Sequence, residues 1–235
     1  MNYRCALQYA RVAGFLLLIS LVAGSFGEMY APMKIIVPDN AAATAKNILS
    51  SDLLFRLGFA SYLVEGICNV AILLVFYVLL RPVQKNIALL AVFFGLIGIS
   101  VFAVAELFYV APLLILGGAD YLNSFTPGQL NTLALLSLNL YGYTAGILMA
   151  FGGACSLFFG YLILKSGYIP PLLGALLALA GIGFVIRNFA LIIAPAYAYD
   201  WLFLPMIFAY LSLTLWFLVR GVDELKWKER AVARE

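Results

Sequence analysis

The chain has 235 residues, of which 65% are hydrophobic and only 11% charged, and its mean hydropathy is +1.05. Soluble domains are about half apolar and a quarter charged, so this composition excludes a soluble domain and indicates an integral membrane protein. The net charge of +3 is too small to predict a nucleic-acid partner. The chain has no histidine, which excludes histidine-ligated haem, most zinc, copper and iron sites, and Ser-His or Cys-His catalysis. We therefore expect no metal and no cofactor.

Six apolar segments are each long enough to cross a bilayer as a helix, which takes roughly 20 residues. The first has a basic start and small residues near Gly24, a pattern also compatible with a cleaved signal peptide. Because its apolar run continues to Met29, we favour a retained span. The whole chain is expected to form one all-α membrane domain, a polytopic helical bundle over residues 1–235. The spans are expected at about 12–31, 53–80, 87–116, 132–164, 171–194 and 201–220.

The connecting segments carry helix-capping signals. Asp39 is placed to cap a short helix that ends near Leu49. The stretch "FTPGQL" predicts a helix start, with Thr126 as N-cap and Gln129 completing a capping box. The helix that follows would be roughly 58 Å long at 1.5 Å per residue, so we expect its first turns in the interface or a kink along it. The tail "DELKWKERAVARE" is expected to form a short surface helix.

Lysine and arginine near the span ends predict the orientation in the membrane. With a cytoplasmic N-terminus, ten of the fourteen basic residues lie on the inner side. Both termini are therefore expected in the cytoplasm. The four basic residues left on the outer side are Lys34, Lys46, Arg56 and Arg187.

Small residues mark the faces along which helices are expected to pack. Gly146, Gly153 and Gly160 recur every seven residues on the fourth span, which predicts a packing seam. Gly98 lies on the same helical stripe as Glu106, where it would let another helix approach closely.

Two long stretches of the chain resemble a known family. They read "EMYAPMKIIVPDNAAATAKNILSSDLLFRLGFASYLVEGICNVAILLVFYVLLRPV" and "GYLILKSGYIPPLLGALLALAGIGFVIRNFAL". The second contains Gly160-Tyr161-Leu162 and Ser166-Gly167-Tyr168, which match a GYL and SGY signature. Over nearly its whole length the chain resembles the bacterial domain-of-unknown-function 4386 family. The resemblance implies a multi-pass protein, which we place in the cell inner (cytoplasmic) membrane, and it implies no activity.

Ionisable side chains lie inside the predicted spans, where an unpaired charge costs several kcal/mol. They are therefore expected to face the protein interior and to pair. Counted from the inner turns at 1.5 Å per residue, Glu28, Glu106 and Arg187 fall in the outer half and Glu65 near the midplane. The residues expected to bind a ligand are Glu28, Glu65, Asn69, Glu106, Tyr109, Asn139, Tyr143, Arg187 and Asn188.

We expect Arg187 to pair with Glu106, which lies at equal depth, and Glu28 or Glu65 to stay partly free. A carboxyl group in that setting can hold a proton near neutral pH. The alternative is a purely structural charge cluster that fixes the helix register. One structural salt bridge does not require three acids, which favours a functional site. Interfacial or lipid-facing aromatic residues are expected at Tyr30, Tyr197, Tyr199, Trp201, Trp216 and Trp227.

Three functions stay open beside the structural alternative. We favour a binding protein that sits in membrane lipid and takes a lipophilic or amphipathic small molecule from the outer leaflet. A membrane-embedded enzyme acting on a lipid or isoprenoid, with terpene-cyclase-like chemistry, would use Glu65 or Glu28 as its catalytic acid. A proton-coupled transporter of small solutes could use acids at different depths as a relay. Six spans would suffice for transport only in a homodimer, and no convincing inverted repeat supports that function.

Overall fold

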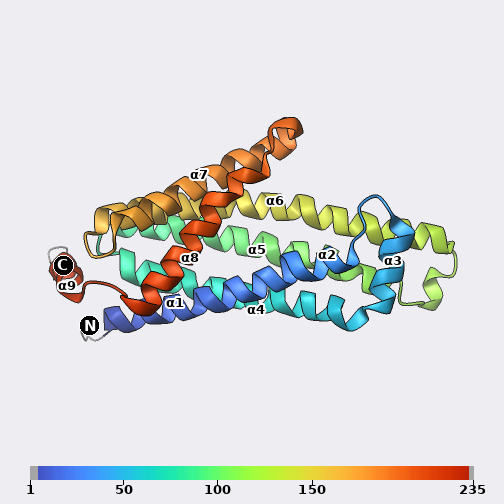
Figure 1. Ribbon diagram of the computed structural model, residues 1–235, viewed down its shortest axis with the longest axis horizontal. Helices are drawn as coiled ribbons and strands as arrows, with labels where there is room; N and C mark the ends of the chain where they lie inside the picture. Colours follow the sequence, from blue (N-terminus) through green and yellow to red (C-terminus); the bar gives the residue numbers. More distant parts are fainter. Residues whose placement is uncertain (1–4, 233–235) are drawn as a thin grey trace. The chain divides into compact units, whose positions relative to one another are not determined.

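The computed structural model describes residues 5–232, which are helical in nearly every segment and contain no strand. Figure 1 labels the helices in chain order. The elements are α1 (Cys5–Gly24), the π-helix η1 (Ser25–Tyr30), α2 (Ala31–Ile35), α3 (Ala41–Ser50), α4 (Asp52–Leu80), α5 (Lys85–Ile115), the 3-10 helix η2 (Asp120–Leu122), α6 (Pro127–Ser166), α7 (Pro171–Ile193), the 3-10 helices η3 (Pro195–Tyr197) and η4 (Asp200–Phe203), α8 (Leu204–Val219) and α9 (Glu224–Val232).

Within the described residues, six helical segments are long and apolar enough to cross a membrane. They coincide with the six predicted spans, and the prediction of an all-α polytopic fold is confirmed. The first segment is longer than expected because α1, η1 and α2 follow one another without a break. The segments are Ala6–Ile35, Asp52–Leu80, Lys85–Ile115, Pro127–Ser166, Pro171–Ile193 and Asp200–Val219.

The chain divides into two compact units. Unit 1 contains Met1–Ile19, Cys68–Ile99 and Gly146–Glu235, and unit 2 contains Ser20–Ile67 and Ser100–Ala145. Helices α1, α4, α5 and α6 contribute residues to both units.

Glycines hold α6 and α7 close together in unit 1. A Cβ atom on Gly153 would lie 2.7 Å from the carbonyl oxygen of Gly181, and one on Gly160 would lie 2.7 Å from that of Gly174. A Cβ on Gly146 would meet the side chain of Asn188 at 3.4 Å. The predicted seam is therefore confirmed, and its partner is the glycine-bearing face of α7.

Helices α7 and α8 also contact each other in unit 1, and Figure 1 shows them diverging from the connection that joins them. A Cβ atom on Gly183 of α7 would lie 2.6 Å from the carbonyl oxygen of Leu202. Phe76 contributes to the core of this unit, with its ring centroid 5.2 Å from that of Phe159 and 5.7 Å from that of Phe217. Aromatic packing among α4, α6 and α8 thus adds to the glycine contacts in the core of unit 1.

The SGY signature forms the turn between α6 and α7. Gly167 has a φ of 78°, a left-handed conformation that favours glycine. The Ser166 hydroxyl accepts from the backbone N–H of Ile169 at 3.3 Å. The Tyr168 hydroxyl donates to the carbonyl of Leu79 near the end of α4 at 2.7 Å. The signature thus ties this turn to a second helix of unit 1.

The predicted helix of the C-terminal tail is present as α9. Asp223 caps it by accepting from the backbone N–H of Leu225 at 3.1 Å. Trp227 was expected in the interfacial belt, and this expectation is wrong, because the residue is only 5% exposed. Its indole Nε1 donates to the carbonyl of Leu79 at 2.9 Å. The amphipathic helix α9 turns Trp227 toward the core of unit 1.

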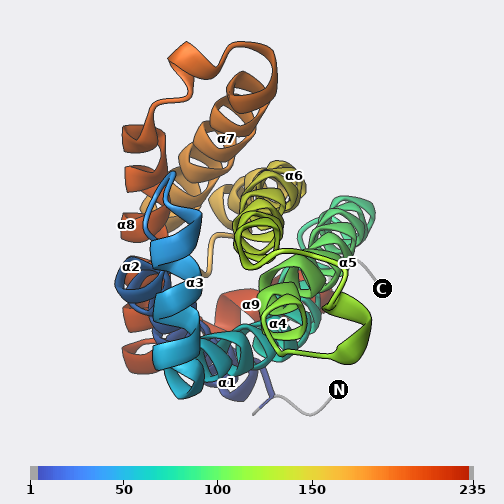
Figure 2. The same ribbon diagram turned by 90° about the vertical axis from the view of Figure 1, so that its right-hand side faces the viewer.

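In unit 2, the short helix α3 contacts α2, and Figure 2 shows the two near each other. The side chain of Asn47 on α3 donates to the carbonyl of Ile35 at 3.0 Å. Asn40 caps α3, since its side chain accepts from the backbone N–H of Ala43 at 2.9 Å. The expectation that Asp39 caps this helix is wrong by one residue, and Asp39 instead has a φ of 58°.

The capping box at the start of α6 is confirmed. The backbone N–H of Thr126 donates to Gln129 Oε1 at 2.8 Å, and the N–H of Gln129 donates to Thr126 Oγ1 at 3.3 Å. From Pro127 the helix continues through 40 residues as one α-helix. At 1.5 Å per residue it is about 60 Å long, which exceeds the hydrocarbon thickness of a bilayer.

Candidate functional site

Three carboxyl groups from three helical elements come together in unit 2. They belong to Glu28 on η1, Glu65 on α4 and Glu106 on α5. Glu106 interacts electrostatically with both Glu28 and Glu65, and Glu28 also acts on the hydroxyls of Tyr62 and Tyr141. Glu28 is exposed, Glu65 is half-buried and Glu106 is 4% exposed. The cluster therefore runs from an accessible acid to a buried one.

Glu106 is the unusual member of the cluster. Both of its carboxyl oxygens are buried and have no hydrogen-bond partner in the described chain. Three residues further along α5, Tyr109 is 1% exposed and its hydroxyl is likewise without a partner. Leaving a buried polar group unsatisfied costs about 1–3 kcal/mol, and more for a charged one. Buried polar groups without a partner are rare in native proteins, and a catalytic role or a bound ion or water is among their explanations.

Aromatic rings surround these polar groups. The rings of Tyr62, Tyr109 and Tyr141 contact one another, with centroid distances between 5.1 and 5.7 Å. Phe55 stacks on Tyr109 at 4.7 Å, and Phe102 meets Tyr62 edge-on at 5.7 Å. Aromatic rings and carboxyl groups therefore lie together in unit 2, a combination that is known from the recognition of organic cations.

Glycines make room for two of the polar groups. A Cβ atom on Gly24 would lie 2.9 Å from Glu65 Oε2. A Cβ atom on Gly58 would lie 2.8 Å from the hydroxyl oxygen of Tyr109. Any larger residue at either position would displace a polar side chain of the cluster.

The π-helix η1 positions Glu28. π-helices are rare and occur frequently at functional sites. The Tyr62 hydroxyl donates to the carbonyl of Gly27 at 2.8 Å, and Gly27 is buried. A Cβ atom on Gly27 would lie 3.1 Å from the carbonyl oxygen of Gly58, so η1 and α4 are in close contact. The widened turn is thus fixed by α4, directly beside the acid that it carries.

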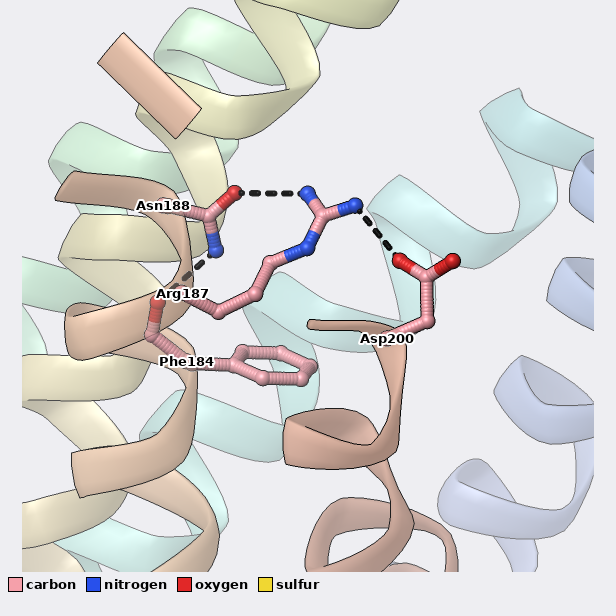
Figure 3. A network of polar contacts seen from close by, with 4 residues as sticks. All are labelled: Phe184, Arg187, Asn188 and Asp200. Atoms are coloured by element: carbon pink, nitrogen blue, oxygen red, sulfur yellow. Dashed lines mark hydrogen bonds and ion pairs between the residues drawn. The ribbon is translucent and has the colours of Figure 1, made fainter. Parts of the chain in front are cut away.

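Arg187 belongs to a separate polar network in unit 1 (Figure 3). Its Nη2 lies 2.9 Å from Asp200 Oδ1, and its Nη1 donates to Asn188 Oδ1 at 3.4 Å. The guanidinium carbon lies 4.5 Å from the ring centroid of Phe203. Asn188 in turn donates to the carbonyl of Phe184 at 2.8 Å. Figure 3 shows Arg187 between Asn188 and Asp200.

The predicted ion pair between Arg187 and Glu106 is therefore wrong. After α7, the short helices η3 and η4 return the chain and bring Asp200 to Arg187. The Arg187 side chain is 18% exposed and that of Asp200 is 85% exposed. Counting depth along a span could not predict this partner, because Asp200 lies in the connecting segment between the fifth and sixth predicted spans.

The other predicted site residues are divided between the units. Asn139 and Tyr143 belong to unit 2, but both side chains are exposed, and Tyr141 contacts the cluster from the same helix. Asn69 and Asn188 belong to unit 1, as Arg187 does. The ligand-binding role of all these residues stays a prediction, as does the catalytic role of Glu65 and Glu28.

Tyr62 and Tyr141 contribute rings to the cluster but were not among the residues expected to bind a ligand. Tyr62 lies three residues before Glu65 and shares its helix face, and Tyr141 is one of the polar groups of the fourth predicted span. Which face of α6 turns toward the cluster depends on the rotation of that helix, so the sequence did not favour Tyr141 over Asn139 and Tyr143.

A family model described as a domain of unknown function (DUF4386) matches residues 12–221. No curated protein and no solved structure matches this chain.

Proposed function

This chain belongs to the DUF4386 family, and we propose that it is a multi-pass membrane protein that binds a small amphipathic molecule by its polar end. The carboxyl groups of Glu28, Glu65 and Glu106 would receive that end. The observation that carries the proposal is the burial of Glu106 with no hydrogen-bond partner for either oxygen in the described chain.

A charge cluster that served packing alone would satisfy its buried members. Within membrane-spanning segments ionisable groups are costly and normally pair, as Arg187 does with Asp200. Glu106 and the Tyr109 hydroxyl depart from that rule side by side on α5. A ligand that supplies the missing partners would recover this cost on binding.

The exposure of the three acids indicates how a ligand would reach the site. Glu28 is accessible, and Glu65 and Glu106 follow in order of increasing burial. Met29 and Tyr30, which follow Glu28, are 61% and 52% exposed and offer an apolar surface to the tail of an amphiphile. We further propose that both termini lie in the cytoplasm, as the distribution of basic residues predicts, so that Glu28 lies toward the outer leaflet and the ligand enters from there.

Binding of matched amphiphiles to the purified protein in lipid nanodiscs tests the proposal. Radiolabelled dodecylamine, dodecanol and dodecanoate share one tail and differ in the head group. We expect at least one to bind saturably, with a single site per chain, and to lose that binding in Glu106→Gln. Glu229→Gln, which alters an exposed glutamate of α9, is the matched control and should bind as the unaltered protein does. Binding that is absent for all three probes, or equal in Glu106→Gln, would refute the proposal.

A further inference from the structure

We infer that the ligand of this cluster is an amphipathic organic cation, bound in exchange for a proton. The inference rests on the proposed function and specifies its ligand class. It follows from the charges, the spacing of the carboxyl groups and the aromatic rings of unit 2.

The charges of unit 2 indicate the sign of the ligand. Unit 2 has three basic residues, and the side chains of all three are exposed in the described structure. Arg56 is engaged by Asp52, with Nε 2.7 Å from Oδ2. No residue of unit 2 in the described chain forms an ion pair or hydrogen bond with the oxygens of Glu106. In its ionised form this buried acid would therefore be complemented by a cation from outside the chain. Besides Arg56, the basic residues of unit 2 are Lys34 and Lys46.

The arrangement of the carboxyl groups indicates the size of the cation. Among the described residues, no three His, Cys, Asp or Glu side chains converge closely enough to hold a metal ion. Glu106 interacts electrostatically with Glu28 and with Glu65, without the three converging as metal ligands do. This arrangement favours a bulky ammonium or phosphonium head over a bare metal ion, which needs oxygen ligands within about 2.6 Å.

The aromatic rings beside the acids indicate an organic cation. Quaternary ammonium groups are recognised by the faces of aromatic rings, often several at once. Tyr62, Tyr109 and Tyr141 contact one another beside the acids, and Tyr62 and Tyr141 both interact with Glu28. Acids that neutralise a cation and rings that replace its hydration thus occur together.

The carboxyl cluster is expected to release a proton when the cation binds. The titratable groups that interact within the cluster are the carboxyls of Glu28 and Glu65 from η1 and α4, that of Glu106 from α5, and three tyrosine hydroxyls. Carboxyl groups that interact in an apolar region are not all ionised together, so the empty cluster holds at least one proton. A bound cation favours the ionised carboxylates. Each cation that binds therefore releases a proton to the bulk solution. The three tyrosine hydroxyls of the cluster belong to Tyr62, Tyr109 and Tyr141.

Two ions of equal size and opposite charge test the inference. Tetraphenylphosphonium and tetraphenylborate would be titrated into the protein in nanodiscs, with empty nanodiscs as the baseline. We expect saturable binding of the phosphonium only. The Kd of the phosphonium should fall by up to about tenfold for each unit by which the pH rises, in the range where binding displaces one proton. A pH-indicator dye in weak buffer should record up to one proton released per cation bound.

Variants separate a binding role from a structural one. Glu106→Gln should weaken phosphonium binding at least tenfold and flatten its pH dependence, whereas Glu229→Gln should change neither. Glu106→Asp keeps the carboxyl group and should restore part of the pH dependence. Tyr141→Phe keeps the ring and should retain affinity, while Tyr141→Leu removes it and should weaken binding about tenfold.

The outcomes distinguish this inference from the proposed function. If dodecanol, dodecanoate or tetraphenylborate binds in a Glu106-dependent way and the phosphonium does not, the cation inference is overturned and the proposed function stands. Phosphonium binding that is independent of pH and releases no proton overturns the exchange. If no probe depends on Glu106, both proposals fail.

Discussion

Tyr168 and Trp227 donate to the same atom, the carbonyl oxygen of Leu79, at 2.7 and 2.9 Å. Leu79 lies in the last turn of α4, where carbonyl groups have no partner within the helix. One donor comes from the turn after α6 and the other from α9. A single acceptor thus joins three segments of unit 1, which gives the tyrosine of the SGY signature a structural role.

This shared acceptor predicts coupled stability effects. Tyr168→Phe and Trp227→Phe each remove one donor and should lower the free energy of unfolding by about 0.5–1.5 kcal/mol. The double variant should lose more than the sum, because the buried carbonyl then has no donor, which costs about 1–3 kcal/mol. Unfolding of the detergent-solubilised protein measures the cycle, and Tyr161→Phe, at an exposed tyrosine, is the control. Strict additivity would show that the two bonds are independent.

The hydroxyl of Tyr168 also predicts a dependence on pH. Burial raises the pKa of Tyr168, and the charge of Arg230 opposes this shift only in part. Because the folded-state pKa is raised, the stabilisation is fully present below the unfolded pKa of about 10 and is lost as the pH rises above it. The stability difference between the unaltered protein and Tyr168→Phe should therefore be constant from pH 6 to 9 and shrink in alkaline solution. Unfolding measured across that series checks it, and a difference that varies near pH 7 would contradict it.

Adjacent glycines on α6 have opposite surroundings and allow a matched test of the seam. A Cβ atom on Gly153 would lie 2.7 Å from the carbonyl oxygen of Gly181, whereas one on Gly152 would meet nothing within 4 Å. Gly153→Ala should push α6 and α7 apart and lower the free energy of unfolding by about 1–3 kcal/mol. Gly152→Ala should be neutral or stabilise by up to about 1 kcal/mol, since alanine favours the helix. Equal effects in thermal unfolding would show that the seam tolerates a methyl group.

Much of this fold could be predicted because local chemistry determines it. In lipid, an apolar run must satisfy its own backbone hydrogen bonds, so such runs become helices and their positions follow from the sequence. The capping box at Thr126 was predictable for the same reason, since both partners lie within one turn. Asp39 and Asn40 are equally suited to cap a helix, and only the left-handed backbone at Asp39 decided between them.

The site was less predictable because its partners are set by tertiary structure. Charge within an apolar run was enough to single out Glu28, Glu65 and Glu106. The partner of Arg187 was not predictable from depth, since the chain reverses after α7 and returns Asp200 to it. A π-helix at η1 has no sequence signature that could have predicted the position of Glu28.

In the network of Arg187, we expect substitutions of Arg187 and of its ionic partner Asp200 to lower stability by unequal amounts. Asp200 is 85% exposed, so Asp200→Asn should lower stability by at most about 1 kcal/mol. Arg187→Gln also removes the contact with the ring of Phe203 and should cost more, by roughly 0.5–2 kcal/mol. Thermal unfolding at low and high salt measures both. Arg56→Gln, which breaks an exposed pair within one helix, should have little effect. A larger loss in Asp200→Asn than in Arg187→Gln would show that the ion pair dominates the network.

Glu106 predicts a conflict between stability and function. Its buried carboxyl oxygens have no partner in the described chain, so Glu106→Leu should raise the free energy of unfolding of the ligand-free protein by about 1–3 kcal/mol. The same variant should not bind tetraphenylphosphonium. Unfolding in detergent measures the first effect, and Glu229→Leu, at an exposed position, should leave stability unchanged. If Glu106→Leu instead destabilises the protein, the carboxyl group contributes to packing, and the structural account of the cluster is favoured. A gain in stability together with lost binding would show that this acid is retained for its ligand, because stability alone selects against it.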